Sequence, residues 1–161
     1  MLQGYRIGLA ADRDAQAFAS RLRAADVEEI RAGSGQSPER ALRRSLALST
    51  HAWSAYDTDG RPLAVWGVGP RGLIVGEGCP WLMATDAFDA LPKRMVARMS
   101  RRLFTDVLAL YPRLQNHVDA RHTTAVRWLR WLGFTLESPA AWGIERRPFH
   151  RFWFDQEKGP A

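Results

Sequence analysis

Hydrophobic residues recur along this chain with two different spacings. Over five segments they return every three or four positions, which predicts amphipathic helices with one apolar face each. Ser37 followed by Pro38 is typical of a helix start, because serine caps the first turn and proline suits its first position. The predicted helices span residues 12–22, 26–32, 37–49, 93–111 and 122–132.

The other apolar residues alternate with polar ones or form short runs, and both patterns are typical of strands. Asp59-Gly60 lies between two such segments and favours a hairpin turn. Residues 81–84 have no polar interruption, which predicts a strand buried on both faces. The predicted strands span residues 4–10, 51–56, 63–68, 80–85, 115–120, 134–136 and 149–154. Helices and strands in this mixed order predict an α/β sheet flanked by helices.

Composition is that of an ordinary globular domain. The chain has 161 residues, 46% hydrophobic and 25% charged, which suits a single domain over residues 1–161. Cys79 is the only cysteine, so no intramolecular disulfide forms and a reducing compartment fits. No apolar run approaches the roughly 20 residues of a membrane span, and the first residues lack a secretory signal. We therefore expect a cytoplasmic protein with no membrane contact and no metal site.

A set of residues at and after the last predicted helix has a recognisable spacing. The set consists of His122, Ala125, Leu129 and Gly133-Phe134. It resembles the corresponding helix of GNAT N-acetyltransferases, which often begins with Asn, carries Ala and Tyr at the same intervals and closes with Gly-Phe. The resemblance implies a GNAT-like fold, with residues 81–85 in a central strand. That strand would run parallel to residues 115–120 and splay from them at one end, where the pantetheine arm of acetyl-CoA enters.

A more particular resemblance covers nearly the whole chain. The segments that carry it are 22–30 (LRAADVEEI), 41–45 (ALRRS), 80–85 (PWLMAT), 100–101 (SR), 111–114 (YPRL) and 118–129, which includes VDAR and WL. They are similar to a GNAT-like accessory family of internal virion proteins in T7-type bacteriophages. This resemblance implies a role in virion morphogenesis, in particular in the internal core, inside a bacterial host cell.

The usual acetyl-CoA motifs of GNAT enzymes are degraded in this sequence. GNAT enzymes hold the CoA pyrophosphate with a glycine-rich turn before the long helix, where backbone N–H groups approach the anion closely. No glycine lies between Gly78 and Gly133, and residues 88–92 (FDALP) occupy the place of that turn. We therefore expect no cofactor, with acetyl-CoA as the alternative. If acyl-CoA does bind, the residues that would contact it are Met83, Ala84, Thr85, Lys93 and Arg94.

Catalytic candidates are few. Leu129 stands where many GNAT enzymes have the tyrosine that protonates the departing thiolate, and leucine has no proton to give. His122 is a candidate because histidine is a common general acid or base, and Asp119 follows the strand as a candidate base. Each also has a structural interpretation, His122 as a helix cap and Asp119 as a helix-entry carboxylate. Whether the chain is an enzyme is left open by these residues.

The net charge of +6 bears on solubility and on anionic partners, and it leaves nucleic acid, CoA phosphates and acidic protein surfaces open. One side of the long helix carries Arg94, Arg98, Arg101 and Arg102, which we expect either to dock an acidic surface of a phage or host protein or to be merely solvated. Nucleic acid is the less expected partner, although basic and aromatic residues interleave over 146–154. The leading hypothesis is a GNAT-fold virion-assembly protein with a degenerate acetyl-CoA site. The alternatives are an active N-acetyltransferase acting on a host or phage protein and, third, a nucleic-acid-binding accessory protein.

Overall fold

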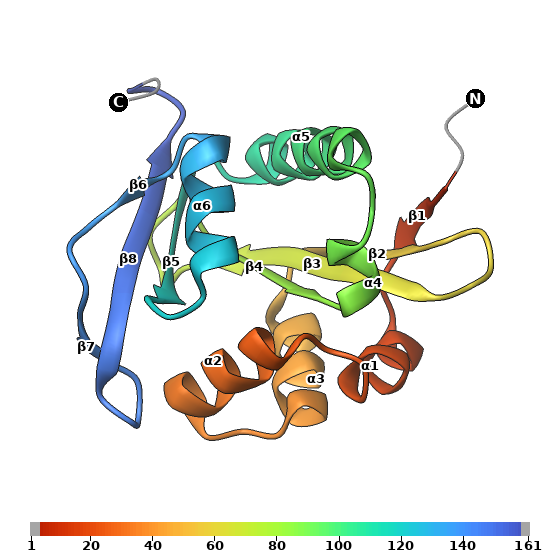
Figure 1. Ribbon diagram of the computed structural model, residues 1–161. Coiled ribbons are helices and arrows are strands. Elements are labelled where there is room, and N and C mark those ends of the chain that lie inside the picture. The colour runs from red at the N-terminus through yellow and green to blue at the C-terminus, as the bar shows by residue number, and fades with distance from the viewer. Residues whose placement is uncertain (1–3, 159–161) are drawn as a thin grey trace.

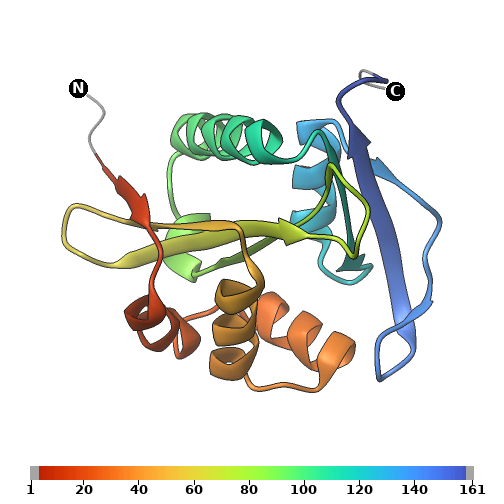
Figure 2. The same ribbon diagram turned by 180° about the vertical axis from the view of Figure 1, so that it is seen from behind.

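The computed structural model describes residues 4–158, which form one mixed sheet with a helical layer on each face (Figures 1 and 2). The strands are β1 (Arg6–Leu9), β2 (His51–Tyr56), β3 (Pro62–Pro70), β4 (Glu77–Ala84), β5 (Arg113–Asp119), β6 (Thr135–Leu136), β7 (Ala140–Trp142) and β8 (Arg147–Asp155). The helices are α1 (Asp12–Ala19), α2 (Ala24–Ser34), α3 (Pro38–Leu48), α4 (Asp86–Asp89), α5 (Lys93–Leu110) and α6 (Thr123–Leu132). The α/β class expected from the periodicities is confirmed.

The sheet has the order β1-β2-β3-β4-β5-β8-β6, and β7 also pairs with β8. All neighbouring strands are antiparallel except β4 and β5, which are parallel. Helices α1, α2 and α3 cover one face, while α5 and α6 cover the other (Figure 1). This arrangement buries two apolar clusters, one on each side of the sheet.

The larger cluster lies under α5 and α6 and contains Trp66, Met99 and Leu114, each at most 2% exposed. The smaller cluster lies under α1–α3 and includes the fully buried Phe18 and Leu42. Alternate residues of β4 belong to the two clusters, since its side chains point alternately to opposite faces. The unbroken apolar run of this strand therefore has the two-sided environment that it predicted.

Local signals place the ends of several helices. Ser37 caps α3 by accepting a hydrogen bond from the backbone N–H of Arg40 at 3.3 Å, and Pro38 takes the first helical position. The α6 helix ends at Gly133, whose φ of 102° lies in the left-handed region that glycine adopts at low cost. Both features agree with the expectations from the sequence.

The strands β4 and β5 separate shortly after they meet. Within residues 4–158 their backbone pairing covers Glu77 with Arg113 and Gly78 with Leu114. Two residues further on, the Asn116 side chain donates to the Pro80 carbonyl at 2.8 Å and bridges the widening gap. The predicted parallel pair with a splay at one end is therefore confirmed.

Some predicted boundaries were wrong. Residues 86–89 form the short helix α4, although no element was expected there, and 140–142 form the additional strand β7. Strand β3 extends to Pro70 rather than ending at residue 68, and β4 begins at Glu77 rather than at residue 80. The first helix ends at Ala19 rather than at residue 22, since Leu22 forms a β-bridge with Thr85. Strand pairing overrides the local pattern at Leu22, at the ends of β3 and β4, and in β7.

No helix within residues 4–158 combines the length and the apolarity that a membrane span requires.

Packing of α6 generates a stability prediction. Trp128 is partly buried against the larger cluster and donates from Nε1 to Ser100 Oγ at 2.8 Å, whereas Arg130 is exposed. Trp128→Ala should lower the free energy of unfolding by about 3–5 kcal/mol through cavity formation. Arg130→Ala should change it by less than about 0.5 kcal/mol. Urea denaturation followed by circular dichroism measures both, and the opposite ranking would contradict the orientation of α6.

Candidate functional site

A cavity of about 1270 Å³ occupies the splay between β4 and β5 and opens toward both helical layers. On one side its walls come from α2, α3 and β7, including Glu29, Arg44 and Trp142. On the other side they come from α5 and α6, including Lys93 and Trp128. A space that reaches both faces of one sheet allows two different molecules, or two parts of one molecule, to meet between the strands.

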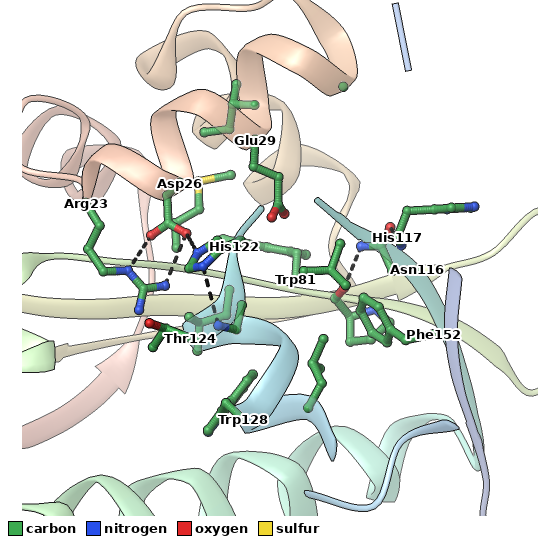
Figure 3. Close-up of a pocket in the computed structure, with 18 of the residues that line it drawn as sticks. Arg23, Asp26, Glu29, Trp81, Asn116, His117, His122, Thr124, Trp128 and Phe152 are labelled. Atoms are coloured by element: carbon green, nitrogen blue, oxygen red, sulfur yellow. Dashed lines mark hydrogen bonds and ion pairs between the residues drawn. The ribbon is translucent and has the colours of Figure 1, made fainter. Parts of the chain in front are cut away.

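Asp26 of α2 lies at the centre of this site and accepts four hydrogen bonds (Figure 3). Arg23 donates from Nε to Oδ2 at 2.9 Å and from Nη2 to Oδ1 at 3.1 Å. The backbone N–H of Ala84 donates to Oδ2 at 3.0 Å, and His122 Nε2 lies 2.9 Å from Oδ1. Burial by itself raises the pKa of Asp26, but the bonds from His122 and Arg23 outweigh it and hold the pKa below its usual value. A buried carboxylate with this set of partners stays ionised at neutral pH.

His122, a predicted catalytic candidate, is 4% exposed and caps α6. Its Nδ1 accepts from the backbone N–H of Ala125 at 3.4 Å. A neutral imidazole that accepts at Nδ1 carries its proton on Nε2, which therefore donates to Asp26. The cap role considered from the sequence is present in the contacts, and a catalytic role for His122 stays a prediction.

Asp119, the second catalytic candidate, is 2% exposed at the end of β5. Its carboxylate accepts from Arg121 at Nε, Nη2 and the backbone N–H. Burial raises the pKa of Asp119, yet the Arg121 bonds lower it further than burial raises it. A carboxylate held this firmly in its ionised form is a weak base at neutral pH.

Glu29 is a third titratable group, and sequence reasoning missed it. It lines the cavity one helical turn beyond Asp26, and its Oε2 accepts from the backbone N–H of Asp119 at 3.2 Å. Burial, reinforced by the negative charges of Asp26 and Asp119, raises the pKa of Glu29 to about 7 despite the opposing effect of His122. The i, i+3 spacing of Asp26 and Glu29, which places both carboxylates on one face of the helix, could have indicated it.

One residue of β4, Leu82, directs a backbone N–H and a carbonyl toward the splay, and both are unpaired within residues 4–158. Hydrogen-bonding directions alternate along a strand. Because the N–H of Thr85 donates to Leu63 in β3, the peptide groups of Leu82 and Ala84 point toward β5. Those of Ala84 are taken, its N–H by Asp26 and its carbonyl by the N–H of Arg23. The peptide groups of Leu82 have no partner on that side among the residues that the structure describes.

The predicted acyl-CoA contacts are only partly brought together. Met83 and Lys93 line the cavity with His122. The Ala84 peptide is occupied, and Thr85 donates its hydroxyl to the Pro62 carbonyl of β3 at 2.7 Å instead of facing the splay. Arg94 is exposed on α5, outside the cavity lining.

Where GNAT enzymes have the glycine-rich turn, this chain has α4. The N–H groups of Phe88, Ala90 and Leu91 donate to Thr85, Asp86 and Phe88, so they are used within the turn itself. Pro92 has no N–H, and Asp89 adds a carboxylate that pairs with Arg23 at 3.0 Å. This segment therefore offers fewer free amides to an anion than a glycine-rich turn does.

Comparison with known proteins identifies the fold. The sequence matches no protein-family model and no curated protein. The structure is similar to a GCN5-related N-acetyltransferase from Kribbella flavida (TM-score 0.67, 20% identity, 94% of this chain and 97% of that chain covered). It is also similar to a spermidine N-acetyltransferase from Vibrio cholerae in complex with CoA and spermine (TM-score 0.67, 12% identity, 96% of both chains). A GNAT-family acetyltransferase from Streptococcus pneumoniae gives a TM-score of 0.59 at 14% identity, over 93% of this chain and 98% of that one. The chain has the GNAT fold.

The Asp26 network predicts a large effect of one substitution. Asp26→Asn removes the buried one of the two carboxylates that pair with the guanidinium of Arg23, whose side chain is 8% exposed, and leaves Asp89, whose side chain is 43% exposed. We expect a loss of about 3–5 kcal/mol in the free energy of unfolding, as for other broken buried pairs. Glu28→Gln, on the same helix but 44% exposed, should change it by less than about 0.5 kcal/mol. Similar values for the two variants in urea denaturation would show that the network does not stabilise the fold.

Glu29 predicts a pH dependence of stability. Its pKa is higher in the folded state, about 7, than in the unfolded state, so folding favours the protonated form. This contribution is complete below about pH 4.5 and is lost as the pH rises through about 7, by at most about 3 kcal/mol. The stability of Glu29→Gln relative to wild type should therefore increase between pH 5 and pH 8. Parallel pH profiles of the two proteins in urea denaturation would contradict the raised pKa.

Proposed function

We propose that this GNAT-fold chain acts in virion morphogenesis of a T7-type bacteriophage, as an accessory of the internal core in the cytoplasm of the bacterial host. In this proposal the fold serves as a scaffold for protein contacts, and its acetyl-CoA site is degenerate. The observation that carries the proposal is the state of the backbone at the two places where GNAT enzymes hold their cosubstrate.

The first place is α4, where Phe88, Ala90 and Leu91 use their N–H groups within the turn and Asp86 adds a negative charge. The second is the end of β4, where Asp26 and Arg23 occupy both peptide groups of Ala84. An incoming pantetheine arm would have to displace a buried ion pair to reach that peptide. Displacement of this kind costs several kcal/mol, which leaves little free energy for binding.

The segments that resemble the phage family support the same proposal. Arg23 and Asp26 lie in segment 22–30, Ala84 in segment 80–85, and His122 in segment 118–129. These are the residues that close the end of the splay (Figure 3). The closing network is thus built from the parts of the chain that carry the resemblance.

Acetyl transfer to an amine is the second candidate, and two observations favour it. The unpaired Leu82 peptide offers a strand-like contact beside an open cavity. Glu29, with a pKa of about 7, is suited to take a proton from an ammonium group at neutral pH. The Vibrio cholerae enzyme with CoA and spermine shares the fold, so a similar use of the cavity is a coherent alternative.

Thermal denaturation with acetyl-CoA separates the two candidates. A ligand at 100 times its dissociation constant stabilises the folded state by about 2.7 kcal/mol. For a domain of this size that corresponds to several degrees, at roughly 2–4 °C per kcal/mol. We expect millimolar acetyl-CoA to raise Tm by less than about 1 °C and no acetyl group to reach an amine acceptor in a mass-spectrometric assay.

ATP is the control, because a basic protein binds polyphosphates weakly through charge alone, and each measurement is repeated at high salt to screen that charge. A shift of several degrees that exceeds the ATP response and persists in salt would refute the scaffold proposal. If transfer to an amine also occurs, Glu29→Gln should reduce it by about 100-fold or more at pH 7, while Glu28→Gln should leave it unchanged.

A further inference from the structure

The positive charge of this protein is concentrated on one helical layer. Helices α5 and α6 carry seven basic side chains and a single carboxylate, Asp106. Their net charge of +6 equals that of the whole protein, so the basic and acidic residues of the rest of the chain balance. The excess positive charge of the protein is therefore located on one helical layer and is not spread evenly over its surface.

The basic residues of the two helices lie on the solvent-exposed surface of that layer. We call this surface the α5–α6 arginine face, and its members are Arg94, Arg98, Arg101, Arg102, Arg127, Arg130 and Trp131, all exposed. The guanidinium of Arg101 lies 5.6 Å from the ring centre of Trp131, which joins the two helices. Of the six arginines, only Arg102 forms an ion pair within the described chain, at 3.9 Å from Asp106.

Trp131 is the second unusual feature of this face. Its side chain is 50% exposed at the mouth of the cavity, although its neighbour Trp128 packs inward. Tryptophan and arginine are the residues most enriched among the energetic centres of protein interfaces, whereas lysine is depleted there. An exposed Trp–Arg stack surrounded by arginines, of which only Arg102 is ion-paired within the described chain, therefore has the composition typical of the centre of a protein interface.

We propose that the α5–α6 arginine face docks an acidic segment of a partner protein, with Trp131 and Arg101 at the centre of the contact. This inference rests on the proposed scaffold function and names the surface that such a scaffold would use. Acidic side chains one helical turn apart on the partner would match the spacing of Arg94, Arg98 and Arg101 along α5.

Two other occupants fit less well. The opposite helical layer of a second copy is not a complementary surface, because helices α1–α3 together carry six acidic and five basic residues. Single-stranded nucleic acid requires several exposed aromatic rings on which bases stack. The aromatic residues of β8 do not supply them, since Phe149 and Phe152 are 2% and 6% exposed and belong to the interior.

The test uses a 20-residue helical peptide with glutamates one turn apart as the probe, and fluorescence anisotropy as the readout. Arg98→Glu/Arg101→Glu should weaken binding by at least about ten-fold, and Trp131→Ala by about five-fold, with Tm unchanged. The matched control is Arg21→Glu/Arg40→Glu, which changes the net charge equally at exposed positions of the opposite layer. It should weaken binding by less than about two-fold.

Equal losses in the two charge-reversal variants would overturn the proposal, because the peptide would then sense net charge alone. A 20-nucleotide oligo-dT that binds more tightly than the peptide at equal salt would assign the face to nucleic acid instead. Acetyl-CoA is titrated into the same proteins, so that the two ideas fail separately. Stabilisation by acetyl-CoA refutes the scaffold function, and loss of peptide selectivity alone refutes only the docking face.

Discussion

The Asp26 carboxylate is the constraint around which this molecule is arranged. A charged group that is buried away from water needs hydrogen bonds to replace those it loses. The donors that supply them to Asp26 come from three parts of the chain. Arg23 comes from the same helix turn, Ala84 from the end of β4, and His122 from the start of α6. One residue thereby fixes the position of α2 against the sheet, the width of the splay and the entry of the last helix.

The same constraint decides what the cavity can do. With Ala84 occupied, the splay is open beside Leu82 and closed at its far end. The two carboxylates that share the region behave differently, because Arg121 neutralises Asp119 whereas Glu29 has no cationic side chain within ion-pairing distance in the described chain. The cavity therefore combines free β4 backbone at Leu82 with a titratable group at Glu29.

Much of the fold was predictable from the sequence, because its signals are local. The hydrophobic periods located the long helices, the apolar run of residues 81–84 located the central strand, and Ser37-Pro38 and Gly133 marked helix ends. The site was less predictable. Glu29 has an ordinary appearance in the sequence, and its raised pKa arises only when β5 and α2 bury it together. Similarly, the helical turn of α4 is stabilised by its surroundings, including the contact of Asp89 with Arg23, which lies 66 positions away.

The seam between β4 and β5 also has a mechanical meaning. On either side of it the strands are joined by continuous antiparallel ladders, whereas the seam itself has two backbone pairs and the Asn116 bridge. The sheet thus consists of two antiparallel parts, β1–β4 and β5–β8, that share few backbone hydrogen bonds. The helical layers that pack across both parts must therefore provide most of the cooperativity of folding between them. Under a pulling force applied across the strands, these two parts would separate at the β4–β5 seam before the antiparallel hydrogen bonds within either part broke.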